Sequence, residues 1–256
     1  MKQVPMFRPR VIPVLLVKGK GLVKSVRFKN YRYIGDPMNA VKLFNDLRAD
    51  ELVFLDIEAT QQNRTIDAEL VRRVGEESNM PFSVGGGIRT LDHIRELTSF
   101  GAERVIIGSE AALNPSFIKQ AADAFGSSTI AVCIDVGKGW FGKKKMVYCN
   151  AKRKAPYDPV EFAQLMQENG AGELVVQSVD RDGTRTGYDI ELLQKISEVT
   201  RIPIVALGGA GELQHMKTAY QEARATGLAA GSLFVYHGTR QGVLINYPSR
   251  EEMDFG

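Results

Sequence analysis

Hydrophobic residues along the chain gather in short runs that recur at regular intervals. Eight such runs, rich in Val, Ile and Leu, lie at 10–17, 51–57, 81–86, 104–109, 129–135, 173–180, 203–209 and 228–234. They are apolar throughout instead of alternating with polar residues, which is typical of strands buried on both faces of a parallel sheet. The pattern therefore predicts eight buried parallel strands.

Amphipathic segments separate most of these runs, and clear examples lie at 36–49, 90–102 and 158–171. Several begin with a capping Asp or Thr and several end on Gly, as helices do. Eight strands alternating with about seven helices over roughly 250 residues predict a closed (β/α)8 barrel, the TIM barrel, as one domain over 1–256. A doubly wound open sheet is the alternative, but no GxGxxG turn follows the first strand.

The two halves of the chain resemble each other. VGGGI at 84–88 ends the third predicted strand, and LGGAG at 207–211 ends the seventh. Asp56 and Asp180 likewise end the second and sixth strands. A nearly constant offset between such features is expected for a barrel built from two half-barrels.

Three segments depart from the regular pattern. Residues 10–25 read as a buried strand running into a loop. Residues 137–150 are too long for an ordinary βα loop and predict a hairpin insertion over the mouth of the barrel. After residue 235 the chain lacks a last amphipathic helix, so we expect a shortened C-terminus that ends in a short acidic tail.

Composition agrees with a globular protein and excludes several classes. Hydrophobic residues make up 44% and charged residues 25% of 256 positions, enough for a sizeable core. The net charge of +3 is diffuse, with no basic run among aromatics, so nucleic acid is not expected as a partner. No signal peptide or long apolar run is present, which predicts a soluble, cytoplasmic protein without membrane contact. Cys133 and Cys149 alone suggest a reducing compartment, although one disulfide remains possible.

Acidic residues follow several predicted strands, at the end of a barrel where active sites lie. They are Asp56, Asp135 and Asp180, with Asp182 just beyond. Any one of them could cap the following loop instead. Their convergence on one rim favours a site.

Glycine clusters lie on the same rim. Gly85, Gly86 and Gly87 follow the third strand, and Gly208 and Gly209 follow the seventh. Backbone N–H groups in such turns can bind phosphate, although single glycines there are usually plain turns. Ser109 and Ser232, from the next strand of each half, could add hydroxyl groups. The doubled arrangement predicts a ligand with a phosphate at each end.

The opposite end of the barrel carries a second group of charges. Arg10, Glu51, Arg104 and Glu173 are the first residues of the first, second, fourth and sixth predicted strands. Single charges often flank strands because solvent is near. Two Arg and two Glu could instead interlock as a neutral ring, tolerated because its members are paired and hydrogen-bonded.

Several motifs resemble the cyclase subunit of imidazole glycerol phosphate synthase. They are DELVFLDIEA at 50–59, VGGGIRT at 84–90, GAGE at 170–173, SVDRDGTRTGYD at 178–189 and GGAG at 208–211. The resemblance runs from the first predicted strand to the eighth. It implies a glutaminase partner on the N-terminal face and ammonia passing the ring of four charges, with Arg104 where the family more often has Lys.

The resemblance also implies a phosphorylated small-molecule ligand at the mouth, with no metal and no cofactor. The positions that match substrate or phosphate contacts are Lys24, Gly85, Gly86, Gly87, Ser109, Asp180, Asp182, Gly183, Gly208, Gly209 and Ser232. In the family, two aspartates on the first and fifth strands perform acid–base chemistry on a bis-phosphorylated substrate.

One of those two aspartates is missing here. Asp135 matches the aspartate of the fifth strand, but IPVLLVK at 12–18 places Leu16 where the family has Asp. Leucine cannot exchange a proton, so half of the acid–base pair is absent. Gly108, Gln177 and Leu207 are further departures at the same end of the barrel.

This set of departures resembles a divergent branch encoded in O-antigen and other surface-polysaccharide pathways. There the barrel works with its own glutaminase and with an ATP-dependent amidotransferase that forms an acetamidino group on a sugar. We therefore predict a protein that supplies ammonia for amidination of a nucleotide-linked sugar. The cyclase of histidine biosynthesis remains one alternative. A non-catalytic scaffold that activates a glutaminase is the other.

Overall fold

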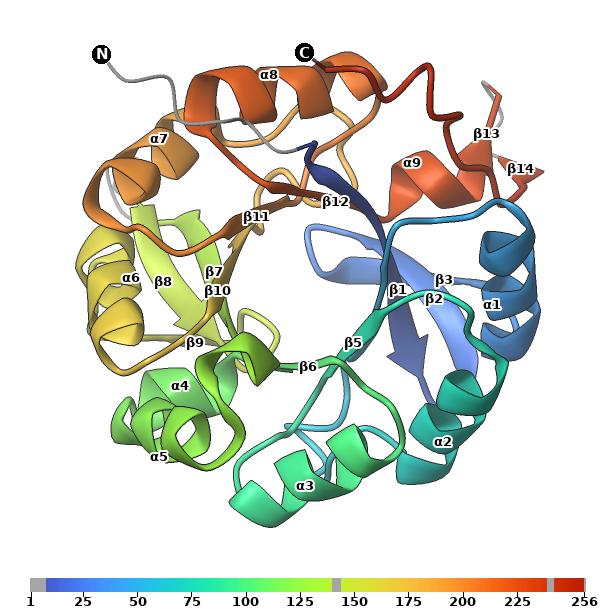
Figure 1. Ribbon diagram of the computed structural model, residues 1–256. Coiled ribbons are helices and arrows are strands. Elements are labelled where there is room, and N and C mark those ends of the chain that lie inside the picture. Colours follow the sequence, from blue (N-terminus) through green and yellow to red (C-terminus); the bar gives the residue numbers. More distant parts are fainter. Residues whose placement is uncertain (1–7, 140–143, 239–241, 256) are drawn as a thin grey trace.

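The computed structural model describes residues 8–139, 144–238 and 242–255, and shows eight parallel strands closed into a barrel (Figure 1). Their order is β1 (Arg10–Lys18), β4 (Leu52–Asp56), β5 (Phe82–Gly85), β6 (Arg104–Ile107), β7 (Ile130–Lys138), β10 (Glu173–Ser178), β11 (Ile204–Leu207) and β12 (Gly227–Ala230). Pairing of Arg10 with Gly227 joins β1 to β12 and closes the barrel. The predicted (β/α)8 fold is confirmed, and the open sheet is excluded.

Helices surround the strands on the outside (Figure 1). They are α1 (Pro37–Asp46), α2 (Ala68–Glu77), α3 (Leu91–Ser99), α4 (Ser109–Leu113), α5 (Ser116–Phe125), α6 (Pro159–Glu168), α7 (Ile190–Val199), α8 (Leu213–Ala223) and α9 (Ser232–Val235), with a 3-10 turn, η1 (Ser127–Thr129). Asp36, Thr90 and Asp158 accept hydrogen bonds from backbone N–H groups of the first turns of α1, α3 and α6. The capping predicted from sequence is therefore confirmed at these helices.

Two predicted strands are shorter than expected. The sequence had placed Ser109 and Ser232 in strands. They are instead the first residues of the short helices α4 and α9. The preceding Gly108 and Gly231 have ψ angles of −77° and −66°, which turn the backbone out of the extended conformation. The apolar runs continue through this change because the strand ends are buried and each short helix buries two residues, Ala111 and Ala112 in α4 and Phe234 and Val235 in α9.

Hairpins extend the first and fifth barrel strands beyond the mouth. β2 (Gly21–Val26) pairs antiparallel with β1 and with β3 (Lys29–Gly35), while β8 (Lys144–Tyr148) pairs with β7 and with β9 (Arg153–Lys154). The sequence predicted a loop at the end of residues 10–25, but these residues continue from β1 into β2, the first strand of a hairpin with β3. Arg27 and Phe28 form its turn with φ angles of 52° and 59°, so the usual Asn-Gly signal is absent.

Apolar side chains form two separate layers. The larger one lies between the strands and the helices, where Phe44, Phe54 and Phe162 are fully buried. The smaller one fills the barrel interior with Ile12, Val14, Val53, Ile106, Ala131, Val175, Val205, Leu207 and Ala229. The interior is thus a packed apolar core, as in other barrels of this size.

The chain after β12 returns to the base of the barrel. It forms α9, then β13 (Tyr236–His237) paired with β14 (Gly242–Val243), and ends beside α8 (Figure 1). Met253 and Phe255 are buried there, and the Phe255 carbonyl accepts a hydrogen bond from Gln221 of α8. Within the described ranges, no helix has the length and apolar character needed to cross a membrane.

Candidate functional site

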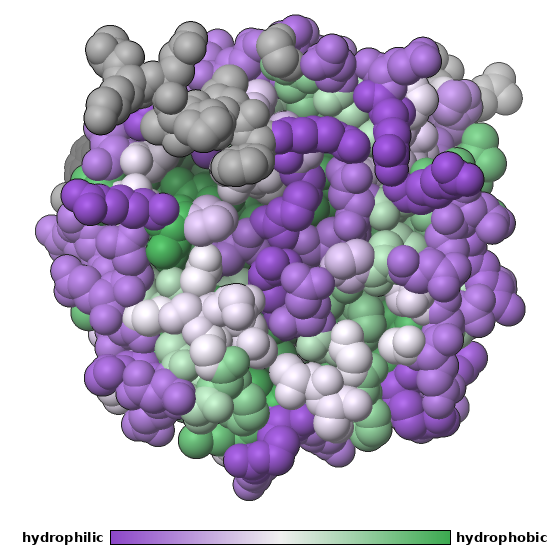
Figure 2. Space-filling model, in the orientation of Figure 1, coloured by the Kyte–Doolittle hydropathy of each residue, from purple (hydrophilic) through white to green (hydrophobic). Residues whose placement is uncertain are grey.

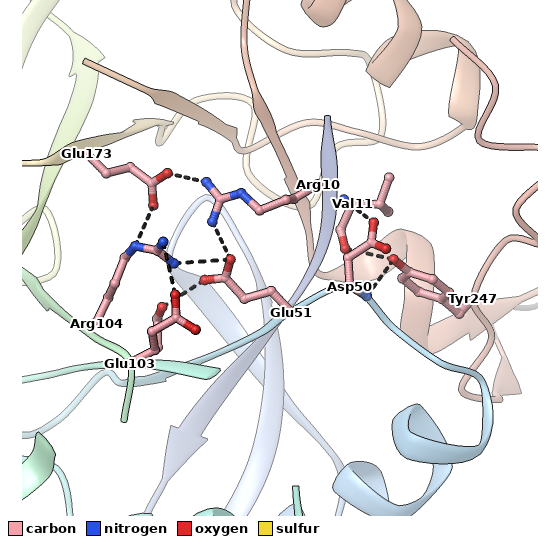
Figure 3. Close-up of polar contacts among 9 residues, drawn as sticks. Arg10, Val11, Asp50, Glu51, Glu103, Arg104, Glu173 and Tyr247 are labelled. Atoms are coloured by element: carbon pink, nitrogen blue, oxygen red, sulfur yellow. Dashed lines mark hydrogen bonds and ion pairs between the residues drawn. The ribbon is translucent and has the colours of Figure 1, made fainter. Parts of the chain in front are cut away.

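Four charged side chains meet across the N-terminal end of the barrel (Figure 3). Arg10 donates hydrogen bonds to both Glu51 and Glu173. Arg104 completes the arrangement, with Nη1 3.6 Å from Oε2 of Glu51 and Nε 3.9 Å from Oε2 of Glu173. Two cations and two anions thus alternate in a closed arrangement, which we call the charged ring.

The two carboxylates of the charged ring are buried and the two guanidinium groups are partly open to solvent. The side chains of Glu51 and Glu173 are 3% and 7% exposed, whereas those of Arg10 and Arg104 are 29% and 21% exposed. Burial raises the pKa of Glu173, and the two arginines oppose that shift. The Ser83 hydroxyl donates to Oε1 of Glu51 at 2.8 Å. The buried carboxylates are therefore both paired and hydrogen-bonded, as burial of charge requires.

The molecular surface at this end of the barrel is hydrophilic at its centre, as expected above a ring of charged side chains (Figure 2). Figure 2 shows strongly hydrophilic residues at the centre of the face seen in Figure 1, with hydrophobic and intermediate surface beside them.

A small cavity lies inside the barrel above the charged ring. Its volume is about 10 Å³, and it is lined at one end by Glu51, Ser83 and Glu173. A space of this size holds about one water-sized molecule. Four apolar residues, Val14, Leu55, Ile106 and Leu207, line this cavity and also line the cavities of the mouth. They therefore form a partition between the interior and the mouth.

The mouth contains two cavities that share Leu16, Ser25 and Gln177. The larger has a volume of about 600 Å³ and is lined by Asp135 of β7 as well as by Leu16 of β1. The two positions of the expected acid–base pair therefore face one space. Only one of them carries a titratable group.

Burial sets the protonation of Asp135. It raises the pKa of this carboxyl to about 6, while a hydrogen bond from Cys133 opposes the shift and the charge of Asp182 adds to it. The Cys133 thiol donates to Oδ1 of Asp135 at 3.4 Å, and burial together with the carboxylate raises the pKa of the thiol. Cys133 is thus a protonated donor. Asp135 titrates close to neutral pH, where general acid–base groups work best.

A second titratable pair lies beside Asp135. Lys24 of β2 is buried and donates to the Val14 carbonyl, and burial lowers its pKa to about 8 although Asp182 opposes the shift. Burial raises the pKa of Asp182, against the effect of Lys24, and the Ser25 hydroxyl donates to Asp182 at 3.2 Å. Three groups with displaced pKa values therefore surround the mouth, which is typical of functional sites.

The two glycine turns lie on different sides of the mouth. Gly86, Gly87 and Ser109 line the larger cavity, whereas Gly183, Gly208, Gly209 and Ser232 line the smaller one with Lys24 and Asp182. Close backbone approach explains why glycine is needed. A Cβ at Gly87 would lie 1.8 Å from the Arg64 carbonyl oxygen, and one at Gly209 would lie 2.2 Å from that of Gly187.

Two of the residues expected at the site lie outside both mouth cavities. Gly85 is buried within β5, and Asp180 follows β10 and accepts a hydrogen bond from the Lys138 N–H at 2.6 Å. Asp56 has a structural role as well, because it accepts from the N–H groups of Glu58 and Ala59 and pairs with Arg64.

A hairpin over the mouth was predicted only for residues 137–150, and sequence reasoning missed its contact with the hairpin of β2 and β3, which roofs the larger cavity. The amide of Asn150 donates to the Tyr31 hydroxyl at 2.9 Å, which joins the two hairpins across the mouth. Phe28, Tyr148 and Lys152 add further lining from the same hairpins. Nothing in the local pattern of these residues signalled the contact, because it joins segments more than a hundred positions apart. Cys149, also in the lining, is a free thiol like Cys133.

The chain is thus a closed (β/α)8 barrel with a charged ring at its base and two glycine-rich cavities at its mouth. Comparison with known proteins shows the family to which this barrel belongs. Residues 10–240 match the family model described as histidine biosynthesis protein, and the chain belongs to that family. Its relatives are HisF-like. A provisionally named imidazole glycerol phosphate synthase subunit HisF of Leptospira interrogans is 43% identical over 250 residues, 97% of this chain and 98% of that protein.

Two further relatives are slightly less similar to this chain. A protein of Pseudomonas aeruginosa, provisionally named imidazole glycerol phosphate synthase subunit hisF2, is 41% identical over 98% of this chain and 100% of its own length. The imidazole glycerol phosphate synthase subunit HisF of Streptococcus sanguinis is 38% identical over 90% of this chain and 92% of its own length.

Proposed function

We propose that this HisF-like barrel receives ammonia from a glutaminase and passes it through its interior to an acceptor at the mouth. The single observation that carries the proposal is an apolar interior with a cavity of about 10 Å³, between the charged ring and the mouth. Neutral ammonia has the size of water and fits such a space. An ammonium ion would be excluded because burying an unpaired charge in apolar surroundings is very costly.

The glutaminase partner docks, on this proposal, at the N-terminal face. The charged ring lies there, and its guanidinium groups remain partly exposed, so a second protein can reach them. Glutaminase docking is what the resemblance to imidazole glycerol phosphate synthase implies, and the relatives are named as subunits of that synthase.

The acceptor differs from that of the histidine-pathway cyclase because of Leu16. Asp135 has no carboxylate opposite it on β1, and each general acid or base typically contributes ~10²–10⁴-fold to a rate. We infer that ammonia serves amidination of a sugar in surface-polysaccharide biosynthesis, with an ATP-dependent amidotransferase as a further partner. The number in the name hisF2 of the Pseudomonas aeruginosa relative supports a protein that is additional to the cyclase.

The cyclase of histidine biosynthesis is the second candidate, and the names of the relatives favour it. The mouth retains Asp135, Asp182 and Lys24, whose displaced pKa values suit proton transfer even without the residue replaced by Leu16. The third candidate is a non-catalytic scaffold that activates a glutaminase. It requires no titratable groups at the mouth, so their presence supports the other two.

A turnover assay separates these candidates. The purified chain is given the bis-phosphorylated intermediate of the histidine pathway with ammonium salt, beside a histidine-pathway cyclase such as the Streptococcus sanguinis relative. We expect turnover near background for this chain. Turnover comparable to that of the reference cyclase would reject the amidination proposal in favour of the cyclase.

A further inference from the structure

The hydroxyl of Tyr247 lies between two chain segments at the base of the barrel (Figure 3). It donates to the Val11 carbonyl at 2.9 Å and accepts from the Asp50 N–H at 3.0 Å. Its ring contacts those of Phe44 and Phe234, with centroids 6.5 and 5.6 Å away. The aromatic packing therefore holds the hydroxyl at a fixed point between β1 and the start of β4.

The hydroxyl bridges a gap in the strand ladder. The pairing between β1 and β4 begins at Val14 and Val53, and counting back three residues on each strand places Val11 opposite Asp50. There the Val11 carbonyl and the Asp50 N–H both bond the Tyr247 hydroxyl. The Val11 N–H donates instead to the Asp50 carboxylate at 3.0 Å. One tyrosine and one aspartate thus join the two segments beyond the end of the ladder.

Both bridged residues are immediate neighbours of the charged ring. Arg10 precedes Val11 and Glu51 follows Asp50, so the bridge fixes the separation of the two backbones that carry a ring cation and a ring anion. Arg10 must reach Glu51 and Glu173 at once. A guanidinium that serves two carboxylates depends on close geometric placement, because its donors form a rigid planar fork.

We propose that Tyr247 is a positioning residue for the charged ring and that the C-terminal segment thereby controls the base of the barrel. The ring acts through Arg10 and Glu51, and the tyrosine sets where their backbones lie. The proposal deepens the function proposed above, on which its consequence for ammonia rests. Its structural part concerns this chain alone.

The structural test uses Tyr247→Phe, which keeps the aromatic packing and removes only the hydroxyl. Tyr188→Phe is the matched control, since the hydroxyl of this buried tyrosine also donates to a backbone carbonyl, that of Ala229 in β12, at 2.9 Å. Nitrogen NMR of the arginine side chains, well below the unfolding temperature, reports the state of Arg10. We expect its guanidinium protons in Tyr247→Phe to exchange faster by about an order of magnitude, as local opening does.

In the control, the Arg10 signals should match those of the wild type even if the protein is less stable. Arg10 signals that are unchanged in folded Tyr247→Phe would overturn the positioning role, whatever the loss of stability. The readout separates the proposal from a general structural role, since both variants lose a tyrosine hydroxyl that donates to a backbone carbonyl.

The functional consequence is measured with the glutaminase and acceptor system. Tyr247→Phe should lower product formed from glutamine relative to product formed from ammonium salt, and Tyr188→Phe should not. A wild-type protein that makes no glutamine-dependent product would contradict the proposed function. The positioning role would still be decided by the exchange of the Arg10 guanidinium protons, which does not depend on the glutaminase.

Discussion

Arg10 donates a hydrogen bond to Glu173, which begins β10, three strands away around the barrel. The contact therefore spans the base of the interior instead of joining neighbouring strands. Together with Glu51 and Arg104 it separates the apolar interior from the face on which we place the glutaminase. Any molecule that enters the interior from that face must pass these four side chains.

Removing one member of the ring should destabilise the fold. Glu51→Ala removes one of the two ring carboxylates shared by Arg10 and Arg104 and leaves the Ser83 hydroxyl without its acceptor. Arg104 also pairs with Glu103 at 3.1 Å, outside the ring, and keeps that partner. Breaking a fully buried pair costs roughly 3–5 kcal/mol, and the partial exposure of both arginines reduces this to about 2–3 kcal/mol. Urea denaturation measures the free energy of unfolding. A change within error of zero would mean that the ring carries no net pairing in solution.

Asp135→Asn should stabilise the protein at neutral pH. The pKa of Asp135 is about 6 in the folded chain and 3.8 ordinarily, so the folded state holds this proton more tightly than the unfolded state. Stability is therefore full below about pH 4 and falls as the pH rises through 6, by about 3 kcal/mol in all. Asparagine does not ionise, so the variant does not lose this stability as the pH rises. It should match the wild type near pH 4 and exceed it near pH 8, and a constant difference between them would contradict the assigned pKa.

Leu16→Asp should restore part of a cyclase. The new carboxylate would face the same cavity as Asp135 and could complete the acid–base pair. We expect turnover of the bis-phosphorylated intermediate with ammonium salt to rise about 10²-fold above the wild type if the site once had this activity. Leu16→Asn is the matched control, because it adds polarity without a titratable group. Equal turnover in both variants would show that the carboxylate is not what is missing.

The barrel and its charged groups could be predicted from the sequence because each leaves a local signal. Continuous apolar runs mark buried strands, and charges at their first residues mark one end of the barrel. The hairpin of β2 and β3 could not be predicted, since its turn uses Arg27 and Phe28 at positive φ without Gly or Asn. The role of Tyr247 was equally hidden. It depends on a contact between residues 236 positions apart, which no local pattern records.

The site was predicted in outline but not in detail. Asp135, Leu16 and the glycine turns face the mouth, whereas Asp180 lies outside its cavities because its carboxylate bonds the Lys138 N–H at the end of β7. That bond exists because β7 continues to Lys138 to pair with β8. The sequence had ended this strand at residue 135.

A glutaminase should form a one-to-one complex at the N-terminal face. Leu47, at the end of α1 and close in sequence to Asp50, is 40% exposed and should lie near the contact. Leu47→Asp should weaken binding in a calorimetric titration with the genomically adjacent glutaminase. Tyr33→Asp, on the hairpin beyond the mouth and 66% exposed, should leave the affinity unchanged. If only the second substitution weakens binding, the partner docks at the opposite end.

On the proposed function, ammonia passes the charged ring and crosses the interior. This route is tested by measuring product from glutamine and product from saturating ammonium salt in the full system, for Arg10→Ala and Arg104→Ala. Arg95→Ala serves as control because Arg95 is exposed on α3 and forms its ion pair with Asp92 of the same helix, away from the charged ring. We predict a lower ratio of glutamine-dependent to ammonium-dependent product in both ring variants than in the wild type. In the control variant, the ratio should equal that of the wild type. A ratio that stays unchanged while both products fall together would mean that the ring only closes the barrel.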